Sequence, residues 1–182
     1  GRLTVKQVFE KSSNVGTAKL ITGLYGDRPK DFVNRLCAMK LNEKLDIQIR
    51  GEGEPLIRYP GDKLWSGISL PMMSHGYEVR MTPLQVLAFY NGIANDGEMV
   101  KPIFVKEITH YGRTIKSYST EVIDPSICSR STLKKVQKML EGVVENGTAM
   151  NLKNDNFRIA GKTGTAQIAN EKYGYKVNSK IS

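Results

Sequence analysis

The stretch from Lys162 to Thr165 carries the chemically most specific residues of the chain. Lys162 supplies an ammonium group, Thr163 and Thr165 supply hydroxyls, and Gly164 has no side chain that would obstruct a peptide lying along a strand edge. This set suits a peptide that ends in a carboxylate. Strict alternation in a strand places Lys162 on one face and both threonines on the other, so one ligand reaches all three only along the edge or at a twist.

Two other structures share features with the same stretch, a phosphate-binding loop and an ordinary strand. A phosphate-binding loop also contains Gly-Lys-Thr, but it requires a glycine five residues before the second glycine, where this chain has Asn156. Residues 157–160 are strand-like, and Gly164 interrupts the position where the helix of such a loop would begin. The motif therefore argues against nucleotide binding, whereas an ordinary strand with a polar surface remains an alternative.

A second candidate is the triplet Ser12-Ser13-Asn14, which places a hydroxyl and a carboxamide at a boundary between two helical patterns. Serine and asparagine are favoured N-caps, so a capped helix beginning near Val15 would explain the triplet without catalysis. Its combination with Lys-Thr-Gly further along the chain is more specific. Ser-x-x-Lys, Ser-Asp-Asn and Lys-Thr-Gly form the signature of class A β-lactamases and penicillin-binding proteins, and the second and third elements occur here in that order.

The elements that must position these residues can be predicted from hydrophobic spacing. Thr82-Pro83 has the form of an N-cap followed by proline at the first helical position. Two helical turns are predicted from residue 4, followed by a break at 12–14 and a helix to residue 25, and further helices are predicted over 32–44, 83–95 and 131–146. A hairpin is predicted over 103–118 and a strand over 157–168. Residues 46–80 are rich in glycine and proline and predict a long irregular connection. This order indicates an α+β fold.

Composition excludes several classes of protein. The 182 residues (20.3 kDa) fit one domain or a large piece of one, and no apolar run approaches the ~18 residues of a membrane span. The net charge of +9 is spread along the chain, which suits an anionic environment without identifying a partner, and no nucleic-acid partner is predicted. The isolated residues Cys37, Cys128, His75 and His110 complete no metal set, so no metal or cofactor is predicted. The two cysteines are expected to be inert thiols, with a bridge between them as the alternative.

The chain resembles the transpeptidase domain of class B penicillin-binding proteins, acyl-serine enzymes that cross-link peptidoglycan. The resemblance lies in four segments in family order, residues 3–16, 76–85, 143–149 and 159–167. Ser13 stands where many β-lactamases have aspartate, and the second segment is more typical of biosynthetic enzymes. Within the class the resemblance favours the septal division type.

The resemblance implies a penicillin-binding protein and serine β-lactamase type of fold, with helices packed on an antiparallel sheet. It also implies that residues 1–182 are a partial transpeptidase domain, since the family's nucleophile lies in a Ser-x-x-Lys motif before Ser-x-Asn. We therefore expect the nucleophile upstream of Gly1 and the final strands downstream of Ser182. The string from Ser131 to Lys134 matches Ser-x-x-Lys, but it lies between the other motifs and begins an amphipathic helix in which Ser131 is the expected N-cap.

The resemblance also implies roles for individual residues. The upstream serine would attack the penultimate D-Ala carbonyl of a stem peptide, its neighbouring lysine would act as base, and the acyl group would pass to an amine of another strand. Ser12 would relay a proton to the leaving D-Ala, and Asn14 would hold the acyl-side amide and orient the lysine of the nucleophile motif. Lys162 would keep the site positive and help position Ser12, so Ser12 Oγ and Lys162 Nζ are predicted to lie within hydrogen-bond to one-water distance. The stretch Thr163-Gly164-Thr165 would bind substrate: the two hydroxyls would bind the terminal carboxylate, and the backbone N–H of the second threonine would donate to the oxyanion.

Partners and location follow from the same resemblance. β-Lactams would acylate the same serine, and other cell-wall synthesis or division proteins are expected partners. The parent protein is expected at the extracytoplasmic face of the bacterial cytoplasmic membrane, with its anchor upstream. Two alternatives stay open: a catalytically inactive penicillin-recognising sensor or scaffold domain, and a D,D-carboxypeptidase or β-lactamase relative.

A fluorescent penicillin should not label the isolated 182 residues, because an acyl-enzyme requires a serine nucleophile with its base in place. In-gel fluorescence, with the parent protein as positive control, measures this. Labelling of the isolated chain that disappears in the Ser131→Ala variant would show that the chain carries its own nucleophile.

Overall fold

The computed structural model describes residues 1–167 and 180–181 of the chain. The chain forms two compact units: unit 1 consists of Gly1–Ser13 and Gln137–Ser182, and unit 2 of Asn14–Val136. Unit 1 therefore contains both Ser12 and Lys162, although the two residues are far apart in sequence.

Unit 1 begins with helix α1, Val5–Glu10, whose first turn is closed by a capping box. The Thr4 hydroxyl accepts the Gln7 N–H at 3.2 Å, and the Gln7 side-chain carbonyl accepts the Thr4 N–H at 2.9 Å. These two bonds satisfy backbone donors that a helix N-terminus leaves without partners. The two helical turns predicted before Ser12 are confirmed.

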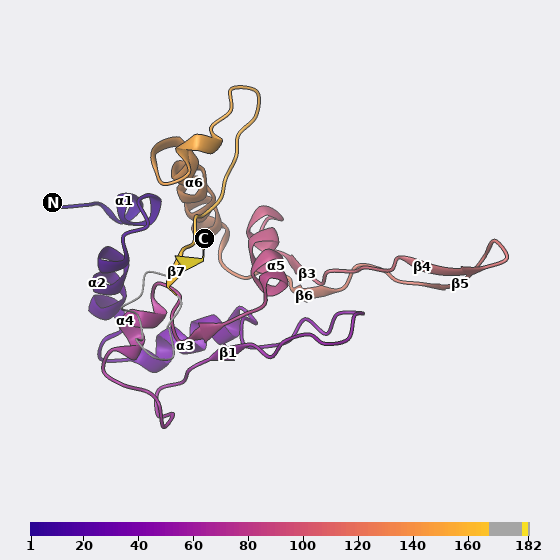
Figure 1. Ribbon diagram of the computed structural model, residues 1–182, viewed down its shortest axis with the longest axis horizontal. Helices are drawn as coiled ribbons and strands as arrows, with labels where there is room; N and C mark the ends of the chain where they lie inside the picture. Colours follow the sequence, from indigo (N-terminus) through magenta and orange to yellow (C-terminus); the bar gives the residue numbers. More distant parts are fainter. Residues whose placement is uncertain (168–179, 182) are drawn as a thin grey trace. The chain divides into compact units, whose positions relative to one another are not determined.

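The core of unit 1 forms around the second half of helix α6, Arg130–Asn146 (Figure 1). The short 3-10 helix η1, Met150–Leu152, follows it and has no buried residue. The members of the core come from three parts of the chain. Val143, Val144 and Ala149 are buried, and Phe9 of α1 and Ile159 pack against them. The core thus ties the chain before Ser12 and the chain before Lys162 to the same helix.

The start of α6 differs from the prediction. Ser129, not Ser131, caps the helix: its hydroxyl accepts the Thr132 N–H at 3.3 Å, and its carbonyl accepts the Leu133 N–H at 2.9 Å. The prediction that Ser131 is the N-cap was wrong, and this residue lies within the first turn. Both serines precede the apolar stripe of the helix. Ser129 is the cap because it lies three residues before Thr132, whose N–H lacks a partner within the helix and bonds the Ser129 hydroxyl.

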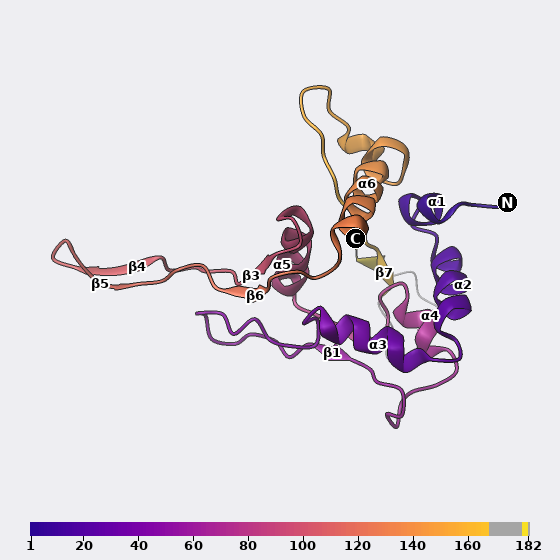
Figure 2. The same cartoon turned by 180° about the vertical axis from the view of Figure 1, so that it is seen from behind.

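Unit 2 contains the helices α2, Asn14–Tyr25, α3, Pro29–Ala38, α4, Ser69–Met73, and α5, Pro83–Ala94. Helix α2 packs beside α4, as Figure 2 shows. Helix α5 begins as predicted, because Thr82 accepts the Gln85 N–H at 3.2 Å and proline occupies the first turn. Helix α3 ends before the predicted position near Lys44, since Lys40 has a φ of 61°, a left-handed conformation in which an α-helix cannot continue.

The strands of the described residues pair antiparallel, two by two. The pairs are β1, Leu56–Ile57, with β2, Val79–Arg80; β3, Met99–Val100, with β6, Val122–Asp124; β4, Glu107–His110, with β5, Arg113–Ser117; and β7, Ala166–Gln167, with β8, Lys180–Ile181. Helices together with antiparallel strands confirm the α+β class. Residues 46–80 were predicted to be irregular throughout, yet they also contain β1, α4 and β2.

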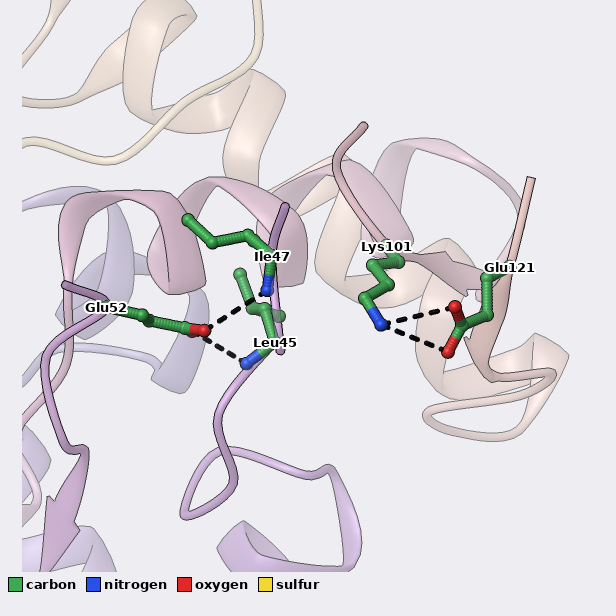
Figure 3. Close-up of polar contacts among 5 residues, drawn as sticks. All are labelled: Leu45, Ile47, Glu52, Lys101 and Glu121. Atoms are coloured by element: carbon green, nitrogen blue, oxygen red, sulfur yellow. Dashed lines mark hydrogen bonds and ion pairs between the residues drawn. The ribbon is translucent and has the colours of Figure 1, made fainter. Parts of the chain in front are cut away.

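Side chains, more than secondary structure, order the start of this connection. The Glu52 carboxylate accepts the backbone N–H groups of Leu45 at 2.7 Å and Ile47 at 3.3 Å (Figure 3). The adjacent Gln48 then accepts the N–H of Phe104 at 2.8 Å, just before β4. The start of the connection is thus fixed by Glu52, and through Gln48 it bonds the chain just before the β4–β5 hairpin.

The hairpin itself is exposed along its whole length and extends away from α5 (Figure 1). At its base, where β3 and β6 pair, Lys101 and Glu121 form an ion pair with Nζ and Oε2 3.2 Å apart (Figure 3). Because an isolated two-stranded hairpin is only marginally stable, these contacts at the base contribute to holding the ribbon in register.

Both cysteines are free thiols, so the alternative of a disulfide between Cys37 and Cys128 is wrong. Burial, with a smaller contribution from the negative charge of Glu43, raises the pKa of the Cys37 thiol.

No helix in the described part of the chain is long and apolar enough to cross a membrane.

Replacing Leu140 of α6 by alanine should lower the free energy of unfolding of the protein by about 2–5 kcal/mol, because its side chain is 5% exposed. Leu152→Ala, at a position 51% exposed, is the matched control and should change it by less than about 0.5 kcal/mol. Urea denaturation followed by circular dichroism measures both. Equal effects of the two substitutions would contradict the described core.

Candidate active site

The two predicted motifs meet through one direct contact. Lys162 Nζ donates to Ser12 Oγ at 2.7 Å, across a sequence separation of 150 residues, and to the backbone carbonyl of Thr163 at 2.9 Å. The prediction that these two side chains converge is confirmed. The contact directs a positive charge at a serine hydroxyl.

The backbone around Ser12 presents this hydroxyl. The Ser12 N–H donates to the Phe9 carbonyl at 3.1 Å and the Ser13 N–H to the Val8 carbonyl at 2.9 Å, which is the hydrogen-bond pattern of a Schellman motif at the end of α1. Ser12 therefore occupies the left-handed position of the motif, with a φ of 51°. Glycine is preferred there, and a side chain in this conformation costs about 1–2 kcal/mol.

The ammonium of Lys162 is half-buried between neutral groups. Beside the Ser12 hydroxyl and the Thr163 carbonyl, the Phe9 ring lies with its centroid 5.9 Å from Nζ, within reach of a cation–π attraction. Burial lowers the pKa of Lys162. Desolvation without a neutralising carboxylate among these contacts leaves the charge available to an anionic ligand.

The stretch around the motif is not a regular strand. Strand β7 begins only at Ala166, so the predicted strand is wrong for residues 157–165, and its last predicted residue, Ile168, lies outside the described residues. Strands form where a neighbouring strand satisfies their backbone groups. Among the described residues the stretch has no such neighbour, and the Gly161 N–H donates instead to the Leu140 carbonyl of α6 at 3.2 Å.

Successive side chains of the motif contact different groups. Thr163 Oγ1 lies 2.5 Å from Thr148 Oγ1, whereas Lys162 contacts Ser12. Gly164 and Thr165 are exposed, and a Cβ added at Gly164 would meet no atom within 4 Å. The last two residues are therefore open to a ligand, while the Thr163 hydroxyl already has a partner.

Asn14 and Thr148 differ in how the sequence predicted them. Asn14 is the first residue of α2 and belongs to unit 2, and its role in the site stays a prediction. Thr148 was not among the predicted site residues. The signal that could have indicated it is its place in segment 143–149, one of the four that carry the resemblance.

Comparison with known proteins identifies the family: residues 1–182 match the penicillin binding protein transpeptidase domain. The chain belongs to this family. It is 33% identical over 179 residues to the penicillin-binding protein PbpB of Mycolicibacterium smegmatis, covering 94% of this chain and 26% of that protein. It is 30% identical over 175 residues to the probable peptidoglycan D,D-transpeptidase PenA of Neisseria flavescens, covering 94% and 39%.

A solved structure supports the same assignment. Penicillin binding protein 3 from Mycobacterium tuberculosis, complexed with ampicillin, superposes with a TM-score of 0.80 and 31% sequence identity, over 96% of this chain and 39% of that chain. The predicted class B family and its transpeptidase fold are confirmed. The chain spans between about a quarter and two-fifths of these relatives, so it corresponds to part of a penicillin-binding protein.

Lys162 should titrate below the ordinary lysine pKa of 10.5, because burial disfavours its charged form. Lys153 is the matched control: its bond to Glu145 raises its pKa, so it should titrate above that value. Reductive methylation with carbon-13 formaldehyde and NMR titration resolves the two midpoints, with Lys162→Arg and Lys153→Arg used to assign the signals. A Lys162 midpoint at or above that of Lys153 would contradict the described environment.

Proposed function

We propose that this chain is part of a peptidoglycan D,D-transpeptidase that cross-links stem peptides through an acyl-serine. The observation that carries the proposal is the 2.7 Å contact between Lys162 Nζ and Ser12 Oγ in a member of the penicillin-binding protein family. This contact brings together two residues to which the family mechanism gives roles in one site, and it joins the two chain segments that make up unit 1.

The reaction has two acyl transfers. The nucleophilic serine, which we place upstream of this chain, forms a bond to the penultimate D-Ala carbonyl of the donor peptide, and the bond to the terminal D-Ala nitrogen breaks. The leaving nitrogen must gain a proton as it departs. The acceptor amine of a second peptide then attacks the ester, which forms the cross-link and releases the serine.

Ser12 is suited to supply the proton to the leaving nitrogen. A serine hydroxyl has one hydrogen to donate and two lone pairs that accept. Lys162 occupies one lone pair as a donor, so the hydrogen of Ser12 is free to point toward the substrate. The adjacent positive charge also makes the hydroxyl a better donor. We assign Asn14 to the acyl-side amide of the donor peptide.

The stretch Thr163-Gly164-Thr165 would bind the donor peptide. The exposed Thr165 can offer its hydroxyl to the terminal carboxylate and its backbone N–H to the oxyanion, and Gly164 leaves room for the peptide backbone. Lys162 would attract the carboxylate. The Thr163 hydroxyl, which bonds Thr148, would accept from Thr148 and donate its own hydrogen to the carboxylate at the same time.

Ligands, partners and location follow as parts of the proposal. β-Lactams would acylate the same serine, an inference supported by the ampicillin complex of the similar penicillin binding protein 3. The similar PenA carries the name of a D,D-transpeptidase, which favours that activity over a sensor domain or a hydrolase. We place the parent protein at the extracytoplasmic face of the membrane, with other cell-wall synthesis proteins as partners; its assignment to the division type stays a prediction.

In the parent protein, Thr165→Ala should slow acylation by penicillin about ten- to a hundredfold. A lost hydrogen bond to a charged group costs roughly 1.5–3 kcal/mol, while the backbone N–H of residue 165 stays in place. Lys162→Ala should cost more, because it removes the charge that attracts the carboxylate and the donor that holds the Ser12 hydroxyl. Second-order acylation rates measure both effects.

Lys153→Ala is the control for charge, since this lysine is exposed and pairs with Glu145 in the same unit. Its acylation rate should stay within about twofold of the parent rate, the size expected for a surface ion pair. Circular dichroism monitors folding of all three variants. If Lys162→Ala and Thr165→Ala both acylate at the parent rate, the stretch does not bind substrate and the proposed roles are wrong.

A further inference from the structure

Gly147 and Thr148 follow helix α6 and contact both segments that form the candidate site. The proposed mechanism gives these two residues no role, although they lie in one of the segments that carry the family resemblance. Their contacts run to the backbone of Glu10, two residues before Ser12, and to the side chain of Thr163, next to Lys162.

The contact with the Ser12 segment depends on the absence of a side chain. The Thr148 N–H donates to the Glu10 carbonyl at 3.2 Å. A Cβ added at Gly147 would overlap that carbonyl oxygen and would lie 2.8 Å from the Val143 carbonyl oxygen. Both are backbone atoms, which cannot rotate away as a side chain can, so glycine is what allows the two chains to approach.

Glu10 is itself held in place. Its side chain is buried against α6, and a Cβ at Gly142 would overlap its carboxylate. Lys6 Nζ lies 3.5 Å from its Oε1. The carbonyl that Thr148 contacts therefore belongs to a residue whose side chain fits the space beside Gly142 of α6.

The contact with the Lys162 segment is a hydroxyl pair. Thr148 Oγ1 and Thr163 Oγ1 are 2.5 Å apart, across 15 residues of sequence. The segment around Thr148 is anchored, since the Ala149 N–H donates to the Val143 carbonyl at 3.1 Å and both residues are buried in the core of unit 1. One anchored residue thus bonds the backbone before Ser12 and the residue after Lys162.

We propose that Gly147 and Thr148 are positioning residues that hold Ser12 and Lys162 at hydrogen-bond distance, acting through Glu10 and Thr163. The inference rests on the proposed function and adds to it the two residues that align the Ser12 motif with the Lys162 motif. Alignment is needed because a lysine side chain has many rotamers and loses about 2 kcal/mol of conformational entropy when one is fixed. Fixing the backbone on both sides leaves fewer arrangements in which the ammonium misses the hydroxyl.

The first test compares Thr148→Val with Thr148→Ser in the parent protein. Valine keeps the shape and loses the hydroxyl, so penicillin acylation should slow about three- to tenfold, the loss of one neutral hydrogen bond. Serine keeps the hydroxyl and should acylate within about twofold of the parent rate. Equal losses in the two variants, or none in either, would overturn the role of the hydroxyl.

The second test does not depend on acylation. In Thr148→Val, a less tightly held Lys162 is more hydrated, so its NMR titration midpoint should rise toward the ordinary lysine value of 10.5. In Thr148→Ser it should not move. If the parent protein is not acylated by penicillin, the proposed function fails, and this titration still decides the positioning role. An unmoved midpoint in Thr148→Val overturns it.

A double-mutant cycle tests whether Thr148 acts through Thr163. In a Thr163→Val background, Thr148→Val should cause no further loss, because the shared bond is already absent. Additive losses would overturn the link. If Thr148→Val does not fold by circular dichroism, Thr163→Val removes the same hydroxyl pair from the other side and its Lys162 midpoint is used instead.

Glycine-to-alanine variants test the backbone contact. Gly147→Ala should slow acylation and raise the Lys162 midpoint as Thr148→Val does, because the new Cβ displaces the Glu10 carbonyl. Gly23→Ala is the control, since a Cβ there meets no atom within 4 Å, and it should leave both readouts unchanged. Equal readouts in the two variants would show that the approach at Gly147 does not matter.

Discussion

The contact between Lys162 Nζ and Ser12 Oγ requires two segments 150 residues apart to be held on one support. Closing so long a separation has an entropic cost that a single exposed hydrogen bond cannot offset. The support is the second half of α6, against which Phe9 and Ile159 pack from the two segments. Burial of apolar side chains thus provides the stability, and the polar contact uses a geometry that the core has already set.

Lys162 differs from other lysines of the chain in what surrounds its charge. Lys44 and Lys153 each bond a glutamate, which raises their pKa, whereas burial lowers the pKa of Lys162. A lysine paired with a glutamate has its charge compensated within the protein. Lys162 instead contacts a hydroxyl, a carbonyl and a ring, so its charge is left for a carboxylate of the ligand.

The sequence allowed the prediction of features that depend on short motifs. The pairing of Ser12 with Lys162 followed from the order of two motifs, and the start of α5 followed from Thr82-Pro83. The sequence did not allow the prediction of features that depend on residues far apart along the chain. The strand expected around Lys162 requires a neighbouring strand, and the contacts of Thr148 arise only when Glu10 and Thr163 meet at the end of α6.

Ser12 illustrates how the site uses the stability of its surroundings. Glycine would adopt its left-handed backbone conformation at a lower free-energy cost, and the Schellman motif needs no side chain at that position. Glycine would provide no hydroxyl to accept from Lys162. The conformational cost is offset by the buried core beside Ser12 and by the bond from the Thr148 N–H to the carbonyl of Glu10, two residues before Ser12. The unfavourable conformation at Ser12 is therefore an indication of function, because only the hydroxyl accounts for a serine there.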